Sequence, residues 1–248
     1  MTILNLVIIF FAGLITASFG TLVGGGSLIT IPTLIFLGLP PNIAIGTNRL
    51  GTNGLIISGL YAFNRKGMVN YKVGLTIGIP ALVGSFFGAN LVLQINLLIL
   101  KYVIGIITLI MLFFTFLKPE IGIEKTKHVI KKHEYLIGVI LSFFLGIYSG
   151  FYGAGTGTFV SYILILVFGQ TFLESAGTRK TVTLLPSLLA TIIFAFAGVI
   201  IYSLGIALFA GNFIGSYIGA HYSDKIGNVW IKRLFFGIVL IMALKLIM

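Results

Sequence analysis

Residues 20–32 read GTLVGGGSLITIP, and this stretch decides how the rest of the chain is interpreted. It lies inside a long apolar run, yet four of its first seven residues are glycine. Glycine is unfavourable in a helix interior and leaves the backbone amides poorly shielded. In a lipid environment, irregular backbone is tolerated only where protein or a water-filled cavity covers it. The stretch therefore predicts a helix that is broken at membrane depth for a functional reason.

The composition predicts an integral membrane protein. Of the 248 residues, 58% are hydrophobic and 8% are charged, and the mean hydropathy is +1.15. In soluble domains about 25% of the residues are charged. At about 20 residues per span, the chain has room for about ten helical segments and for no separate soluble domain. The apolar runs predict these segments at residues 3–19, 26–39, 42–63, 71–93, 96–117, 135–150, 157–169, 172–200, 202–222 and 227–248.

The chain reads as two copies of one unit. GSFFGA at 84–89 reappears as GSYIGA at 215–220, and Gly46-Thr47 reappears as Gly177-Thr178. Both matches are separated by 131 positions (215 minus 84 and 177 minus 46). Matches at one constant spacing indicate an internal duplication. We therefore expect one membrane domain with a first copy over residues 1–117, a cytoplasmic basic linker over 118–134 and a second copy over 135–248.

Lysine and arginine mark the cytoplasmic side. The most basic connections are the loop after 42–63, the linker, and the loop after 202–222. Positively charged loops stay in the cytoplasm, and these three fall on one side if every segment crosses the bilayer. Both termini are then expected outside the cell. Because each copy has five segments, the second copy enters from the opposite face. The predicted fold is an all-α membrane protein with two inverted repeats.

The glycine-rich breaks are the first candidate site. The short segments 26–39 and 157–169 each begin at a glycine cluster. In transporters with inverted repeats, broken helices mark the binding site near the bilayer midplane, and free amides at a helix start favour an anion. The alternative is close helix packing, which we expect for the glycines of GSFFGA and GSYIGA. The candidate residues are Gly24, Gly25, Gly26, Ser27, Gly153, Gly155, Thr156 and Gly157.

Three cations inside predicted spans are the second candidate site. Arg49 lies in AIGTNRLGTN and Arg179-Lys180 in SAGTRKTVT, with Glu174 near the helix start as the only acid close by. A cation at the bilayer centre costs about 2.5–3.5 kcal/mol on insertion scales. Uncompensated cations predict an anionic substrate, which arginine can bind through two donors. The alternative is that these long side chains reach the lipid headgroups. The candidate residues are Thr47, Asn48, Arg49, Thr178, Arg179 and Lys180.

No motif predicts a cofactor, a metal site or catalysis. The sequence has no cysteine, which excludes disulfides and thiolate ligands, and it has no GxxxxGK[ST] phosphate-binding loop. No nucleophile, base and orienting group are assembled, so we do not expect an enzyme. The net charge of +11 comes mostly from short loops, as the orientation rule requires, so nucleic-acid binding is not expected. The expected partners are the lipid bilayer and a small anion.

The paired motifs resemble a known family. GTLVGGGSLITIP followed by AIGTN, and GFYGAGTGTF followed by SAGTRK, are similar to the TauE/SafE sulfite exporter family, also called the toluene sulfonate uptake permease family. The resemblance covers nearly the whole chain. It implies a bacterial or archaeal inner-membrane carrier, coupled to protons, for sulfite or sulfonates such as sulfoacetate. The pairs Asn48-Arg49 and Arg179-Lys180 depart from the small polar residues of the family. The implied substrate contacts are Gly24, Gly25, Gly26, Thr47, Asn48, Gly153, Gly155, Gly157, Thr178 and Arg179.

These observations predict a secondary transporter that moves small sulfur-containing anions by alternating access. An anion channel would share the basic lining but would conduct without saturable exchange. A membrane scaffold, in which the glycines only pack helices, is the third alternative. Protons would travel with a protonatable anion or through His221. The chain is expected to work as a monomer or a homodimer.

Overall fold

The described part of the chain is entirely helical. The structure, a computed structural model, describes residues 2–116, 132–223, 240, 242, 244 and 245, and these contain no strand. The helices are α1 (Ile3–Val23), α2 (Ser27–Phe36), α3 (Pro41–Arg65), α4 (Tyr71–Gln94), α5 (Leu97–Phe116), α6 (Lys132–Phe151), α7 (Thr156–Leu166), α8 (Phe172–Phe196) and α9 (Tyr202–His221).

The helix lengths agree with the prediction of an all-α membrane protein. Among the described helices, α1, α4, α6, α8 and α9 are long and apolar enough to cross a membrane. By contrast, α2 and α7 have 10 and 11 residues. At 1.5 Å per residue they are only about half as long as a bilayer core is thick. The predicted segment 227–248 lies almost entirely outside the described residues, so ten segments in inverted repeats remain a prediction.

Both helix breaks occur where the glycine clusters predicted them. The first long helix ends at Val23, Gly24 follows in the left-handed conformation with φ 96°, and α2 begins at Ser27. In the second copy, Gly153 and Gly155 both have φ 78° between α6 and α7. Glycine adopts these angles without the steric penalty of a side chain. The chain can therefore leave one helix and start the next within a few residues.

Five predicted boundaries were wrong by three or four residues, including the ends of α2 at Phe36 and of α7 at Leu166, which were predicted at 39 and 169. α1 continues to Val23 instead of ending at residue 19, and α6 begins at Lys132, inside the predicted linker. The rest of that linker, residues 118–131, lies outside the described part. α8 ends at Phe196 rather than at 200, because Gly198 takes a left-handed φ of 67° and turns the chain toward α9.

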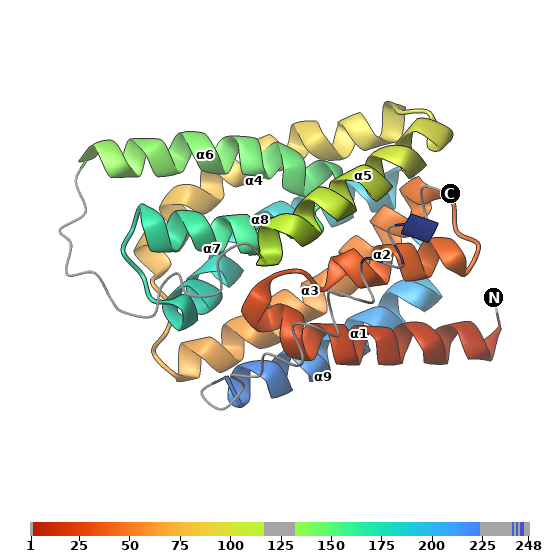
Figure 1. The fold of residues 1–248 in the computed structure, drawn as a ribbon, viewed down its shortest axis with the longest axis horizontal. Helices are drawn as coiled ribbons and strands as arrows, with labels where there is room; N and C mark the ends of the chain where they lie inside the picture. Colours follow the sequence, from red (N-terminus) through yellow and green to blue (C-terminus); the bar gives the residue numbers. More distant parts are fainter. Residues whose placement is uncertain (1, 117–131, 224–239, 241, 243, 246–248) are drawn as a thin grey trace.

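Glycines let two pairs of helices approach at backbone distance. Figure 1 shows α1 beside α9, and α4 beside α6 on the opposite side of the molecule. A Cβ atom at Gly215 would overlap the carbonyl of Leu14, and one at Gly84 would overlap the carbonyl of Phe143. Gly219 and Gly88 meet neighbouring carbonyls in the same way. The packing role expected for GSFFGA and GSYIGA is confirmed.

The two sequence copies interlock. α4, from the first copy, packs against α6 and α8 of the second copy, whereas α9 packs against α1 and α3 of the first (Figure 1). The fourth helix of each copy therefore packs mainly against helices of the other copy. Residues of both copies share the largest hydrophobic cluster, and the short helices α2 and α7 lie between the two exchanged pairs (Figure 1).

A glycine substitution on α4 tests this packing. We expect Gly84→Ala to lower the free energy of unfolding by about 1–3 kcal/mol, because the added methyl group overpacks the contact with α6. Gly78→Ala, on the same helix, is the matched control, since its Cβ would lie no closer than 3.3 Å to a neighbouring atom. Thermal unfolding in detergent measures both. Equal unfolding temperatures for the two variants would contradict the packing described here.

Candidate functional site

The two helix breaks touch each other in the middle of the molecule. The hydroxyl of Thr158, on α7, donates a hydrogen bond of 2.9 Å to the carbonyl of Val23 at the end of α1. A Cβ atom on Gly157 would lie 2.9 Å from the Cα of Gly24. Only glycine at both positions permits this contact. The breaks of the two copies therefore form one junction.

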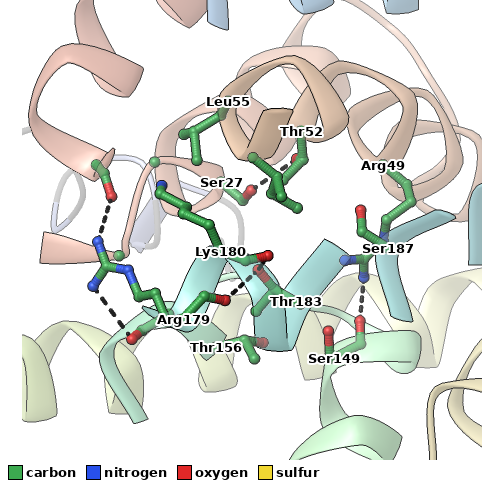
Figure 2. Close-up of a pocket in the computed structure, with 16 residues that line it drawn as sticks. Ser27, Arg49, Thr52, Leu55, Ser149, Thr156, Arg179, Lys180, Thr183 and Ser187 are labelled. Carbon is green, nitrogen blue, oxygen red and sulfur yellow. Dashed lines mark hydrogen bonds between the residues drawn. The ribbon is translucent and has the colours of Figure 1, made fainter. Parts of the chain in front are cut away.

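A cavity of about 60 Å³, which we call the central cavity, adjoins this junction (Figure 2). Its wall comes from α1, α2, α3, α6, α7 and α8 and the two breaks, so both copies contribute. Nine of the predicted site residues lie in the wall, which brings both candidate sites together: Gly24, Gly26, Ser27, Arg49, Gly153, Thr156, Gly157, Arg179 and Lys180.

Several other wall residues were not predicted. Thr52 and Thr183 are related by the repeat spacing of 131 (183 minus 52), and each follows an arginine by about one helical turn. Residues three or four apart share a helix face, so this signal was present in the sequence. The other unpredicted wall residues carry no such signal in the sequence; they are Gly20, Leu55, Ile56, Ser149 and Ser187.

The three cations of the site are buried in the protein. The exposed fractions are 6% for Arg49 and 2% for both Arg179 and Lys180. The alternative that these side chains reach the headgroups is therefore wrong. In the part of the wall that the structure describes there is no Asp or Glu. Glu174 instead forms the capping box of α8, where its carboxylate accepts from the amide of Thr171 at 3.0 Å.

Arg179 binds the broken end of α1. One terminal nitrogen donates to the carbonyls of Gly20 and Thr21, at 3.3 and 2.5 Å. The other donates to the Ser161 hydroxyl at 2.8 Å and to the Gly157 carbonyl at 3.4 Å. Carbonyls at a helix C-terminus carry partial negative charge and stabilise a cation. Both terminal nitrogens of Arg179 thus have protein partners, which differs from the expectation that they bind the substrate.

Arg49 makes the corresponding contact with the other copy. Its guanidinium donates to the carbonyl of Ser149 near the end of α6, and Figure 2 shows the two residues facing each other. The neighbouring Gly153 leaves space for the guanidinium, because a Cβ there would lie 2.9 Å from its central carbon. Each arginine therefore links its own copy to the broken helix of the other copy.

Lys180 has no such partner. Its side chain extends into the central cavity (Figure 2), and it makes neither a hydrogen bond nor an ion pair with any described residue. Gly59 provides room for the aliphatic chain, since a Cβ there would lie 2.8 Å from the Lys180 Cε. The hydroxyl of Thr156, in the same wall, is also buried without a hydrogen-bond partner. These two side chains are free to bind a ligand.

Asn48 forms a hydrogen bond to a residue of the cavity wall. Its amide nitrogen donates to the Ser27 hydroxyl at 3.1 Å, and its amide oxygen accepts from Thr30 at 2.5 Å. Asn48 itself does not line the central cavity. The structure therefore places Asn48 behind Ser27 at the start of α2 and not in the cavity wall, where a substrate contact was predicted.

Thr47 and Thr178 were also predicted as substrate contacts, and the structure places them elsewhere. The Thr178 hydroxyl accepts from the amide of Asn70, and the Thr47 hydroxyl accepts from the amide of Ile201, both at 3.0 Å. The repeat spacing relates these bonds (178 minus 47 and 201 minus 70). The repeated Gly-Thr pair therefore holds the loops that lead into α4 and α9.

Gly25, Gly155 and His221 also lie outside the cavity wall. A Cβ on Gly155 would meet Met111 of α5, so this glycine serves packing at the second break. His221 is at the exposed end of α9, where its ring stacks on Tyr217 with centroids 6.0 Å apart. The proposed proton relay through His221 thus has no contact with the central cavity.

Comparison with known proteins agrees with this architecture. The profile of the family described as "Sulfite exporter TauE/SafE" matches residues 9–246. The chain belongs to this family. Together with its candidate spans, the membership identifies a multi-pass membrane protein of a transporter family. No solved structure matches the chain.

Several curated relatives of the chain are named probable membrane transporter proteins. One from Haemophilus influenzae is 30% identical over 98% of this chain and 94% of its own length. YdhB of Bacillus subtilis is 29% identical over 94% and 95%, and YfcA of Escherichia coli K12 is 25% identical over 97% and 88%.

The different environments of Arg179 and Lys180 predict opposite effects on stability. Without anions, we expect Lys180→Met to raise the free energy of unfolding by up to about 3 kcal/mol, because a buried unpaired cation is removed. Arg179→Met should lower it by about 2–4 kcal/mol, because charged hydrogen bonds are lost and carbonyls are left unpaired. Denaturant unfolding in anion-poor detergent buffer measures both. A destabilised Lys180→Met variant would mean that the ammonium has a partner.

Proposed function

We propose that the protein is a secondary transporter of small oxyanions such as sulfite and that the central cavity is its binding site. The observation that carries this proposal is the ammonium group of Lys180, which is buried in the cavity without a protein partner. An isolated charge is costly in a low-dielectric interior, and an anion of opposite charge removes that cost.

The rest of the wall is suited to an anion. The N-termini of α2 and α7 lie at the cavity, and no side chain caps either of them. Helix N-termini carry partial positive charge and present amides to a bound anion. The Thr156 hydroxyl adds a donor that has no other acceptor. A lysine, a hydroxyl and two helix N-termini are a donor set for oxygen atoms that carry negative charge.

The size of the cavity is suited to a small oxyanion. A volume of about 60 Å³ holds about four to six water molecules. An ion such as sulfite fits this space, and so does a small sulfonate such as sulfoacetate, because one water molecule occupies about 30 Å³ of the liquid. The family description as a sulfite exporter supports the same substrate class.

The proposed mechanism is alternating access in the plasma membrane, in an inverted-repeat architecture with both termini outside. The support is the junction of the two breaks beside the cavity, because broken helices at the centre are the usual site of such carriers. No carboxylate or imidazole lies in the described wall. We expect a coupled proton to travel on the anion itself.

Uptake by proteoliposomes tests this function. We expect saturable uptake of radiolabelled sulfite, stimulated by a pH gradient and inhibited by unlabelled sulfite. Lys180→Met should lower the rate at subsaturating sulfite by about 10–100-fold, the loss of one charge-assisted contact of about 1.5–3 kcal/mol.

Lys101→Met is the matched control, because Lys101 lies in α5 and does not line the cavity. It should transport at the rate of the unchanged protein. Normal sulfite uptake by Lys180→Met would reject the proposed site. An ohmic current without saturation would indicate a channel instead of a carrier.

A further inference from the structure

We propose that the bodies that move during transport are two swapped bundles and not the two sequence copies. Bundle A contains α1, α2, α3 and α9, and bundle B contains α4, α6, α7 and α8. This inference rests on the proposed carrier function, because it specifies which parts of the carrier move. α5 contacts α3, and its Thr108 bonds to Tyr152 beyond α6, so we assign it to neither bundle.

Inside each bundle, the contacts between helices from different copies are backbone to backbone. Within bundle A, a Cβ on Gly211 would overlap the carbonyl of Phe10 of α1. Within bundle B, Gly88 meets the carbonyl of Ile147 of α6 in the same way. No layer of side chains lies between these helices to absorb a displacement. Separating the two copies would break these contacts between residues 10–18 and 211–219, and between residues 81–88 and 143–150.

Apart from the close backbone approach of Gly24 and Gly157 at the junction of the breaks, the contacts between the bundles are of a different kind. They come mainly from α3 facing α8, where Asn53 donates to the Thr191 hydroxyl at 2.9 Å and accepts from Ser187 at 2.7 Å. The arginine links described above also cross this boundary. These hydrogen bonds join polar groups that can exchange partners with each other or with water. A sliding interface requires contacts that can exchange partners, and tightly packed backbones cannot do so.

The central cavity lies on the same boundary. Arg49 and Thr52 of α3 line it from bundle A, and Lys180, Thr183 and Ser187 of α8 line it from bundle B. A movement of one bundle against the other would therefore open the binding site. A movement of one sequence copy against the other would first have to separate α1 from α9 and α4 from α6.

The chain crosses between the bundles at loops that contain equivalent glycines. Gly67 lies between α3 and α4, and Gly198 lies between α8 and α9, 131 positions later (198 minus 67). Their φ angles are 66° and 67°, and no atom lies within 4 Å of a Cβ built at either position. An unpacked glycine in a connecting loop can absorb a change of backbone angle, as a hinge does.

Directly after each hinge, the loop is fixed to the bundle that it enters. Thr178 of α8 accepts from Asn70, the residue before α4, and both helices belong to bundle B. Thr47 of α3 accepts from Ile201, the residue before α9, and both helices belong to bundle A. Thr47 and Thr178 are thus positioning residues that confine the bending to Gly67 and Gly198.

Crosslinking distinguishes the two sets of moving bodies, and the cysteine-free sequence makes engineered thiols the only ones present. Phe87→Cys with Phe143→Cys joins α4 to α6, whose two rings lie 6.3 Å apart. This pair lies within bundle B but between the copies. Asn53→Cys with Thr191→Cys joins α3 to α8 and so joins bundle A to bundle B. None of these four positions lines the central cavity.

A short bifunctional thiol reagent is applied to both double variants in proteoliposomes, and sulfite uptake is measured before crosslinking, afterwards and after reduction. We expect the Phe87–Phe143 crosslink to leave the rate within about twofold and the Asn53–Thr191 crosslink to lower it about tenfold or more, with recovery on reduction. The single-cysteine variants control for the substitutions themselves. Any other pattern overturns the inference, including loss of uptake with both crosslinks or with neither.

A second measurement separates this result from a failure of the proposed function. Ser27→Cys, added to each pair, is labelled by a membrane-impermeant thiol reagent from either side, which requires no substrate. We expect two-sided labelling with the Phe87–Phe143 crosslink and one-sided labelling with the Asn53–Thr191 crosslink. One-sided labelling of the reduced proteins as well would reject alternating access itself, and the inference with it.

The role of Thr178 as a positioning residue has its own readout. Thr178→Val removes the acceptor for the Asn70 amide without touching the cavity. We expect a lower maximal rate of sulfite uptake at an unchanged half-saturating concentration, and Thr178→Ser should restore the rate. A changed half-saturating concentration with a normal maximal rate would place Thr178 in substrate binding and contradict the assignment.

Discussion

The structure depends on how three buried cations are accommodated at membrane depth. A cation in this environment needs a partner, because desolvation is costly and lipid supplies no counter-charge. Arg49 and Arg179 find theirs in backbone carbonyls near the broken ends of α6 and α1. Lys180 finds none in the described protein. The breaks therefore do two things, because they stabilise two charges and create the space into which the third extends.

Glycine makes this arrangement sterically feasible. At Gly24 and Gly153 it permits the left-handed backbone that ends a long helix inside the protein. At Gly84 and Gly215 the missing side chain lets the backbone of one helix contact a carbonyl oxygen of a helix from the other copy. The close packing at Gly84 and Gly215 holds the exchanged helices together. The helix ends at Gly24 and Gly153 produce the cavity between the two bundles. One residue type thus supplies both rigid contacts and the opening that a carrier requires.

Much of the fold and part of the site followed from sequence patterns, because their causes are local. The start of α2 at Ser27 and the wall residues around Arg179 could be predicted from glycine clusters and unbalanced charge. The exchange of α4 and α9 could not, because it depends on long-range packing that apolar periodicity does not encode. For the same reason the hydrogen bonds of Thr47 and Thr178 to the loops before α9 and α4 could not be predicted. Their partners, Ile201 and Asn70, lie more than a hundred positions away.

The central claim is that the unpartnered ammonium of Lys180 binds an anion between the two breaks. Diffraction from crystals soaked with selenite, the selenium counterpart of sulfite, tests it most directly, because anomalous scattering locates selenium without assumptions about the protein. The account predicts one peak in the central cavity with an oxygen in hydrogen-bond contact with the Lys180 Nζ. A cavity without selenium, with the Lys180 ammonium bound to a protein carbonyl or carboxylate, would contradict it.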